Sequence, residues 1–403
     1  MYSLGLIDSR AISSRNGGSE RHVREILRRL SYRYEIYYIP TTHSFLDDRP
    51  AEGWLKDVKK YAKVPSFFEY LLEKGETTSL VRELFTFSPL ARKLFDEYKK
   101  EIGEVDFAYI PHNYRIQLMS SILLSRLGNR YGMLLMTDPH NSLLEKESIF
   151  KCIDYYHKIE LSRIKAIERC IAQRVQDTIF LAKVLRRKPS FIAVMNPGAR
   201  YYTQLGKFFD LRVLSPPHAF NPIALKYRSF DKDDYIVFVG RISTAKGAHE
   251  ALELARHVKL KMVGYSESKF IANKAKSLGI EIIENATEEE KFEVMSRAKA
   301  LVLPSHQESF SVTTLEALAV GTPVIAYDLP SLTSLYRFKP IFFIRESDID
   351  SMIIKAKELI KLDNKAIENM FSDDNLEKFL KLHSSWDNVA NAVDSLIKNF
   401  ILS

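Results

Sequence analysis

Short apolar runs alternate with amphipathic stretches along the whole chain. The runs are rich in β-branched and aromatic residues and are bounded by glycine, proline or polar turns, which predicts buried strands. Strands that alternate with helices favour parallel sheets covered by helices on both faces, an α/β class. The predicted strands are 4–7, 34–39, 107–110, 132–137, 178–181, 191–195 and 211–214 in the first half, and 236–239, 260–263, 281–283, 300–303, 324–327 and 341–344 in the second.

Helical spacing of apolar residues is clear in several of the stretches between these strands. Val23, Ile26, Leu27 and Leu30 share one face of a helix after the first strand. We also expect helices over 154–174 and 386–400, and a basic amphipathic helix over 54–63. The last of these is equally consistent with a surface helix packed on the sheet. The segment 47–100 is helical in pattern but too irregular to place.

The length of the chain suits two domains, and the run S-P-P-H-A-F-N-P at 215–222 is the best boundary between them. With 46% hydrophobic and 27% charged residues, the composition is that of an ordinary globular protein. Cys152 and Cys170 are the only cysteines. Two cysteines exclude a disulfide framework or a thiolate zinc cage, and we expect a reducing compartment.

The chain opens directly on its first predicted strand, without a basic leader, so we expect no signal peptide. No run reaches the ~18 apolar residues that a membrane span needs. We therefore expect a cytoplasmic protein. The formal charge of +8 predicts an anionic partner, which could be a nucleotide, a phospholipid surface or a nucleic acid.

The most informative stretch is A-L-V-L-P-S-H-Q-E-S-F-S-V-T-T-L-E-A-L-A-V-G-T-P-V-I-A, residues 300–326. A buried strand leads into a polar elbow, 305–311, and then into a helix. Glu308 stands at the tip of the elbow and Glu316 in the first turns of the helix. The amino end of a helix attracts phosphate. Carboxylates accept hydrogen bonds from hydroxyl groups, so a helix start with two glutamates suits a sugar nucleotide, which has both phosphate and hydroxyl groups. The alternative is a capping box at Thr313-x-x-Glu316 with Glu308 as a solvated loop carboxylate.

Several common ligand motifs are missing from the sequence. No strand is followed by G-x-G-x-x-G, which argues against the binding of nicotinamide or flavin cofactors. There is also no Gly-Lys-Ser/Thr phosphate loop, which argues against hydrolysis of nucleoside triphosphates. The dense acidic run Asp231–Asp234 reads as a solvated turn and gives no support for a metal site. We therefore expect no cofactor and no metal.

The motif after Glu308, E-S-F-S-V-T-T-L-E-A-L-A-V-G-T-P-V-I-A, resembles the signature of retaining GT-B glycosyltransferases related to glycogen and sucrose synthases (group 1, family 4). Upstream, F-V-G-R-I-S-T-A-K-G resembles the same family's strand-turn element, and Ser385-Trp386-Asp387 its final helix. The resemblance is strong from Tyr235 to Tyr336. It implies two Rossmann-like doubly wound domains facing a crevice, with acceptor-side residues 1–215, nucleotide-sugar-binding residues 216–385 and a helix, 386–403, that crosses back.

The resemblance also implies roles for individual residues. Arg241 and Lys246 would hold the donor diphosphate in place of a metal, although a solvated Arg–Lys pair is the plainer alternative. Glu308 would accept hydrogen bonds from the donor sugar, and Glu316 from the ribose. Further donor contacts are expected from Gly17, Gly18, Ile283, Glu284, Ser309, Phe310, Ser311, Val312 and Thr313.

One position departs from the family pattern. Relatives usually carry a histidine directly after the strand predicted here at 132–137. In this chain Asp138 occupies that place and His140 follows two residues later. Both are candidate catalytic residues, and which of them replaces the histidine stays open.

The resemblance implies a metal-independent enzyme that moves a hexose, with retention and on one face of the sugar, from a UDP- or GDP-linked donor to a glycan or lipid-linked acceptor. The alternatives are a non-catalytic partner subunit that binds nucleotide or membrane, and a sugar-nucleotide isomerase. No nucleic-acid partner is expected. Arg21, Arg24 and Arg28, with the lysines of 54–63, suggest peripheral contact with the anionic inner face of a membrane.

Overall fold

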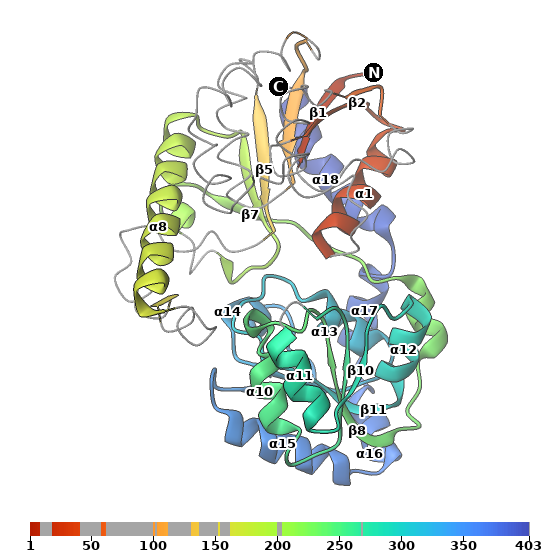
Figure 1. The fold of residues 1–403 in the computed structure, drawn as a ribbon. Helices are drawn as coiled ribbons and strands as arrows, with labels where there is room; N and C mark the ends of the chain where they lie inside the picture. Colours follow the sequence, from red (N-terminus) through yellow and green to blue (C-terminus); the bar gives the residue numbers. More distant parts are fainter. Residues whose placement is uncertain are drawn as a thin grey trace. The chain divides into compact units, whose positions relative to one another are not determined.

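The chain divides into two compact units in the computed structural model (Figure 1). The first unit contains Met1–Met195, Ala199–Pro217 and Val389–Ser403, and the second contains Asn196–Gly198 and His218–Asn388. The residues that the structure describes are 1–8, 18–40, 58–61, 100, 103–111, 130–136, 152–153, 162–199, 204–266 and 269–402.

The first unit is built on a seven-stranded parallel sheet with the order β3-β2-β1-β4-β5-β6-β7. Strands β4, β5 and β6 are buried along their whole length, as expected where helices cover a parallel sheet on both faces. Its elements are β1 (Ser3–Asp8), α1 (Gly18–Leu30), β2 (Glu35–Pro40), β3 (Lys60–Tyr61), β4 (Phe107–Ile110), β5 (Tyr131–Leu135), α8 (Arg163–Arg186), β6 (Phe191–Val194), η2 (Gln204–Lys207) and β7 (Leu211–Val213).

Most strands predicted for this unit are confirmed, but two local predictions are wrong. The expected strand at 178–181 lies inside the long helix α8, because a short apolar run does not by itself distinguish a strand from a helix segment. Lys60 and Tyr61, expected within a basic helix, form β3 and pair with Tyr37 and Tyr38 of β2. The rest of the expected helix, apart from Val58 and Lys59, lies outside the described residues.

The cysteine prediction is also wrong. Cys152 and Cys170 are joined by a disulfide, with their Cα atoms 6.0 Å apart. A count of two cysteines cannot reveal whether the fold brings them within bridging distance, which is what decides pairing. The cysteines therefore give no argument for a reducing compartment.

The basic row expected on the first helix does not face solvent as a whole. Arg24 is only 8% exposed, whereas Arg28 is exposed and Arg21 is intermediate. Helix α1 turns Val23, Ile26, Leu27 and Leu30 into the core as predicted, and Arg24 is buried along with them. A continuous basic surface along α1 is thus not formed.

The second unit is a six-stranded parallel sheet with the order β10-β9-β8-β11-β12-β13. Helices α10, α11 and α15 pack on one face, and α12, α13 and α17 on the other (Figure 1). The strands are β8 (Asp233–Val239), β9 (Leu260–Val263), β10 (Glu281–Ile283), β11 (Ala298–Leu303), β12 (Val324–Tyr327) and β13 (Ile341–Ile344). The helices are η3 (Pro222–Tyr227), η4 (Thr244–Lys246), α10 (Ala248–Leu254), α11 (Lys269–Ser277), α12 (Glu288–Arg297), α13 (Val312–Ala319), α14 (Pro330–Thr333), α15 (Ile349–Lys361), α16 (Asn364–Met370) and α17 (Asp374–Leu382).

The last helix, α18 (Trp386–Ile401), belongs to the first unit from Val389 onward. There Asp394 accepts hydrogen bonds from the Tyr34 hydroxyl and from Arg33 Nη1, both at 2.6 Å. Phe400 packs on Phe191, with ring centroids 5.5 Å apart. Among the described residues, we find no helix with the length and apolar character needed to cross a membrane.

Candidate functional site

The order of the second sheet reverses at β8, which has β9 on one side and β11 on the other. In open parallel sheets, ligands bind at such a switch point, beyond the carboxyl ends of the strands. The segment 240–247 follows β8, and the segment 304–311 follows β11. These two segments carry six of the predicted site residues, namely Arg241, Lys246, Glu308, Ser309, Phe310 and Ser311.

Glycines allow the two segments to approach closely. Gly247 has a φ of +69°, and a Cβ at this position would lie 1.9 Å from the carbonyl oxygen of Pro304. A side chain is therefore excluded both by the left-handed backbone and by contact with the elbow. Gly247 thus places the turn that contains Lys246 directly against the segment that contains Glu308.

Lys246 and Glu308 form an ion pair across these segments, with Nζ 2.6 Å from Oε1. The Glu308 side chain is 8% exposed and that of Lys246 is 25% exposed. The alternative of a solvated loop carboxylate is therefore wrong for Glu308. A carboxylate can accept hydrogen bonds from hydroxyl groups, and a lysine beside it can bind phosphate, so the pair can contact both parts of one ligand.

Side chains hold the backbone of the elbow in one orientation. Asn196 Nδ2 donates to the carbonyl of Ser309 at 2.7 Å, and the Tyr336 hydroxyl donates to the carbonyls of Phe310 and Ser311 at 2.7 and 3.1 Å. In a trans peptide the N–H points opposite to the carbonyl. The N–H groups of the residues that follow, through Val312, therefore point away from Asn196 and Tyr336.

Two further features fix the elbow. Ser311, the amino-terminal cap of α13, has a φ of 55°, which is uncommon for a residue with a side chain and typical of functional loops. The Phe310 ring is buried and packs on the rings of His218, Tyr336 and His383. Burial lowers the pKa of His383 to about 4, so this ring is neutral and its Nδ1 donates to the carbonyl of His218 at 2.7 Å.

Glu316 has a different partner from the one considered in the capping-box alternative. The cap of α13 is Ser311, so a box at Thr313 is not formed. The Glu316 carboxylate is 5% exposed and lies 2.9 Å from Nζ of Lys291 on α12. Sequence reasoning missed Lys291, because E-E-E-K at the start of α12 has the composition of a solvent-exposed helix face.

The remaining predicted residues are spread around the same edge or lie elsewhere. Ile283 is half-buried at the end of β10, and Glu284 after it is exposed. Arg241 is exposed and follows Gly240 at the end of β8. Gly18 begins α1 in the first unit. Gly17, Asp138 and His140 lie outside the described residues.

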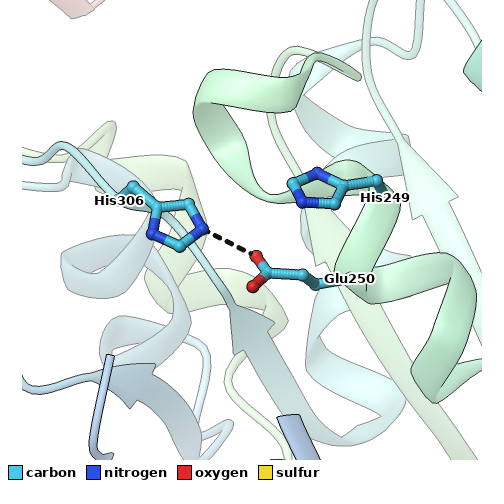
Figure 2. Close-up of side chains that lie close together, drawn as sticks. All are labelled: His249, Glu250 and His306. Atoms are coloured by element: carbon cyan, nitrogen blue, oxygen red, sulfur yellow. Dashed lines mark hydrogen bonds and ion pairs between the residues drawn. The ribbon is translucent and has the colours of Figure 1, made fainter. Parts of the chain in front are cut away.

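A second polar cluster at this edge was not predicted. His306 lies between two carboxylates. Its Nε2 is 3.0 Å from Glu250 (Figure 2), and its Nδ1 is 2.9 Å from Glu346. Burial lowers the pKa of His306, but the hydrogen bonds and charges of the two glutamates outweigh it and raise the pKa to about 9. The cluster joins residues far apart in sequence, so no local motif could reveal it.

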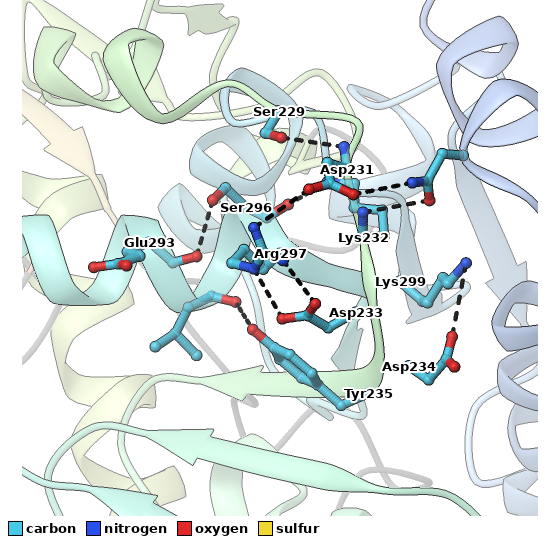
Figure 3. Close-up of polar contacts among 12 residues, drawn as sticks. Ser229, Asp231, Lys232, Asp233, Asp234, Tyr235, Glu293, Ser296, Arg297 and Lys299 are labelled. Atoms are coloured by element: carbon cyan, nitrogen blue, oxygen red, sulfur yellow. Dashed lines mark hydrogen bonds and ion pairs between the residues drawn. The ribbon is translucent and has the colours of Figure 1, made fainter.

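The acidic run Asp231–Asp234 forms ion pairs at the amino end of β8, away from the switch point (Figure 3). Arg297 holds Asp233 through two hydrogen bonds of 2.8 Å. Between these aspartates, Lys232 is buried and donates to the carbonyl of Ser296 at the end of α12. Burial, followed by the charges of Lys299 and Arg297, lowers the pKa of Lys232 to about 7. This cluster joins β8 to α12 and has a structural role.

Two curated proteins are similar to part of the chain. A 177-residue match is 23% identical to the capsular polysaccharide biosynthesis glycosyltransferase CapM of Staphylococcus aureus and covers 38% of this chain and 46% of that protein. A 181-residue match is 29% identical to the D-inositol 3-phosphate glycosyltransferase of Frankia alni and covers 39% and 41%. The chain thus spans less than half the length of the curated relatives it matches.

Solved structures match over nearly the whole chain. Anabaena Alr3699/HepE in complex with UDP aligns with a TM-score of 0.66 at 13% identity, covering 98% of this chain and 100% of that one. Sucrose-phosphate synthase from Thermosynechococcus elongatus aligns with a TM-score of 0.68 at 14% identity and covers both chains completely. At these identities the likeness establishes the fold.

The family model "Glycosyl transferases group 1" matches residues 222–371, which contain Arg241, Lys246, Glu308 and Glu316. The two doubly wound parallel sheets match those of GT-B glycosyltransferase structures. Residues 222–371 are thus similar to the group 1 glycosyl transferases, and the fold of the chain is GT-B.

Proposed function

We propose that the protein is a retaining glycosyltransferase that moves a hexose from a UDP- or GDP-linked sugar to a glycan or lipid-linked acceptor. The observation that carries this proposal is the Lys246–Glu308 ion pair at the switch point of the second sheet. The family match over the same residues and the resemblance of both motifs to those of the family support it.

In this proposal the donor diphosphate is held by fixed positive groups. Lys246 and Arg241 come from the segment after β8, and the backbone N–H groups at the start of α13 add the positive end of a helix dipole. Such groups, held in place before reaction, stabilise the charge that develops on the leaving diphosphate. The reaction is then independent of a metal.

The two glutamates divide the recognition of hydroxyl groups. Glu308 accepts hydrogen bonds from the donor sugar while Lys246, its partner, turns toward the phosphate. Glu316 accepts from the ribose, and Lys291 keeps that nearly buried carboxylate oriented. No protein nucleophile is required, because the sugar reacts on one face and the leaving phosphate assists deprotonation of the acceptor.

What related proteins bind supports this class of donor. HepE has been solved in complex with UDP and in complex with UDP-glucose, and both curated relatives described above are named as glycosyltransferases. A lipid-linked acceptor stays within the proposal. Membrane docking through a basic row on α1 is not part of the proposal, because Arg24 is buried. Docking through a basic helix over 54–63 is not part of it either, because Lys60 lies in β3.

The test is a turnover assay with a panel of UDP-, GDP- and ADP-linked hexoses, in which release of the nucleoside diphosphate is measured with and without candidate acceptors. We expect one donor to be consumed and the product to keep the donor's anomeric configuration by NMR. The Lys246→Ala variant should lose this activity, while Lys276→Ala, on the exposed part of α11, should keep it.

Other outcomes of the assay would contradict the proposal. Nucleotide binding in a thermal-shift screen without turnover of any donor would favour a non-catalytic subunit. Conversion of the donor without transfer would favour an isomerase, and inversion of the anomeric centre would exclude the same-face mechanism.

A further inference from the structure

Three side chains that can bind a metal converge beside the elbow of the second unit. His249 and Glu250 stand in the first turn of α10, which begins directly after Gly247, and His306 follows β11 (Figure 2). One ligand atom from each lies within 4.8 Å of those of the other two. His306 Nε2 and Glu250 Oε2 are already 3.0 Å apart, close to the ~3.3 Å that separates two ligands of a tetrahedral zinc ion.

Outer hydrogen bonds orient two of these three groups. The Glu346 carboxylate lies 2.9 Å from Nδ1 of His306, which turns Nε2 toward the cluster. The Tyr327 hydroxyl donates to Oε1 of Glu250 at 2.9 Å, which leaves Oε2 facing His306. A carboxylate behind a ligating histidine, and a hydrogen bond behind a ligating carboxylate, are the usual supports of protein metal sites.

We propose that His249, Glu250 and His306 bind one Zn²⁺ ion. Two imidazoles and one carboxylate form a common zinc ligand set in which the fourth position is left to water. The imidazoles disfavour Mg²⁺ and Ca²⁺, which prefer oxygen ligands. The site goes beyond the proposed function, because none of the three residues has a part in holding the donor.

The bound ion would connect two segments that also meet at the donor site. Two ligands come from the first turn of α10, just after the turn that contains Lys246, and the third ligand stands two residues before Glu308. The ion would therefore link these segments in parallel with the Lys246–Glu308 ion pair. Zinc binding should accordingly raise the thermal stability of the protein.

The experiment uses the full chain without a histidine tag, stripped of metals by a chelator and then titrated with Zn²⁺ by calorimetry. We expect one ion per chain in the wild type and a rise in melting temperature. The His249→Gln variant removes a ligand while retaining the contacts of His306 with both glutamates, and it should weaken binding at least tenfold. The matched control is His257→Gln, an exposed histidine just after the same helix, which should bind like the wild type.

A third variant tests the outer support. Glu346→Gln leaves all three ligands in place but weakens the hold on His306, and it should lower zinc affinity by about 10- to 100-fold, the usual effect of losing such a partner. Co²⁺ should bind in place of zinc with the absorption spectrum of a four-coordinate ion. Equal affinity in the wild type and His249→Gln, or no stoichiometric uptake at all, would overturn the proposal and leave the cluster as an ion-pair network only.

Discussion

Lys291 Nζ on α12 lies 2.9 Å from Glu316 Oε2 on α13, and both side chains are largely buried. This pair joins two helices on the same face of the second sheet. Removing one member of such a pair leaves an uncompensated charge in a site poor in water. Lys291 therefore determines how Glu316 is presented, although nothing in its local sequence indicates this.

Lys291→Met should lower the free energy of unfolding by about 3 kcal/mol, because Glu316 then remains buried without its cation. Chemical denaturation measures this. The control is Glu288→Gln, which removes the more exposed partner of Lys291 and should cost less than about 1 kcal/mol. If the two charges stabilise each other, the double variant Lys291→Met/Glu316→Gln should recover much of the unfolding free energy that Lys291→Met loses. A loss in the double variant equal to the sum of the two single losses would show that the residues act independently.

The two glutamates should affect different kinetic constants. Glu308→Gln keeps the shape of the side chain but weakens its acceptor strength toward the donor sugar, so kcat should fall while nucleotide binding changes little. Glu316→Ala should mainly weaken nucleotide binding and raise KM. Steady-state kinetics and calorimetry with the nucleoside diphosphate separate the two effects. Full activity in Glu308→Gln would rule out its assigned role.

The positive groups after β8 should be needed for turnover. Lys246→Ala and Arg241→Ala should each lower kcat by about 10²-fold or more, the scale for loss of one preorganised stabilising group. Activity should be nearly unchanged by chelators, because the proposed zinc site does not hold the donor. An absolute requirement for added manganese or magnesium would contradict the metal-independent mechanism.

A matched pair of glycines separates backbone strain from steric contact. Gly247 and Gly279 have nearly equal φ values, +69° and +70°, but an added Cβ meets Pro304 O at 1.9 Å in Gly247 and nothing within 4 Å in Gly279. Gly279→Ala should cost about 1–2 kcal/mol from the left-handed backbone alone. Gly247→Ala should cost clearly more and also lower activity, since the turn of Lys246 must move. Equal melting temperatures of the two variants would contradict the close packing on Pro304.

His383 should make stability depend on pH in mildly acidic solution. Its pKa is about 4 in the folded protein because the ring is buried, against about 6.5 in an unfolded chain. Between these values the unfolded state binds the proton and the folded state does not, so stability falls as pH falls. From pH 6.5 to pH 5 this group should remove about 1–2 kcal/mol.

The variant that checks this is His383→Asn, whose amide can still donate to the carbonyl of His218 but does not titrate. Its baseline stability is expected to be lower, so the quantity to compare is the change in unfolding free energy with pH. Between pH 6.5 and pH 5, that change should be smaller in the variant than in the wild type by about 1–2 kcal/mol. Identical pH profiles would show that His383 is not the responsible group.

The strands of the second unit could be predicted from the sequence because each is a short apolar run closed by a glycine, a proline or a polar turn. Leu260–Val263, Val324–Tyr327 and Ile341–Ile344 are confirmed residue for residue. The run at 178–181 has the same apolar character but belongs to α8. This run differs from the strands because helical residues continue on both sides of it. A run of four residues is too short to reveal helical periodicity.

The candidate site was predictable only where a motif is local. Glu308 and Lys246 lie in recognisable motifs, and their pairing follows from the neighbouring positions of β8 and β11 in the sheet. Asn196, Lys291 and Tyr336 support the site from distant parts of the chain. Each is an ordinary residue in its own segment, and it gains a role only through tertiary contact.

The placement of α18 has a consequence for the order in which the protein folds during synthesis. Tyr34 and Phe191 of the first unit are translated well before their partners Asp394 and Phe400. The second unit, almost continuous in sequence, can complete its sheet as it leaves the ribosome, while the first unit must wait for a segment made after the whole of the second. Until then, apolar surface that α18 will cover stays accessible to chaperones, and truncation of this helix should impair the unit synthesised first.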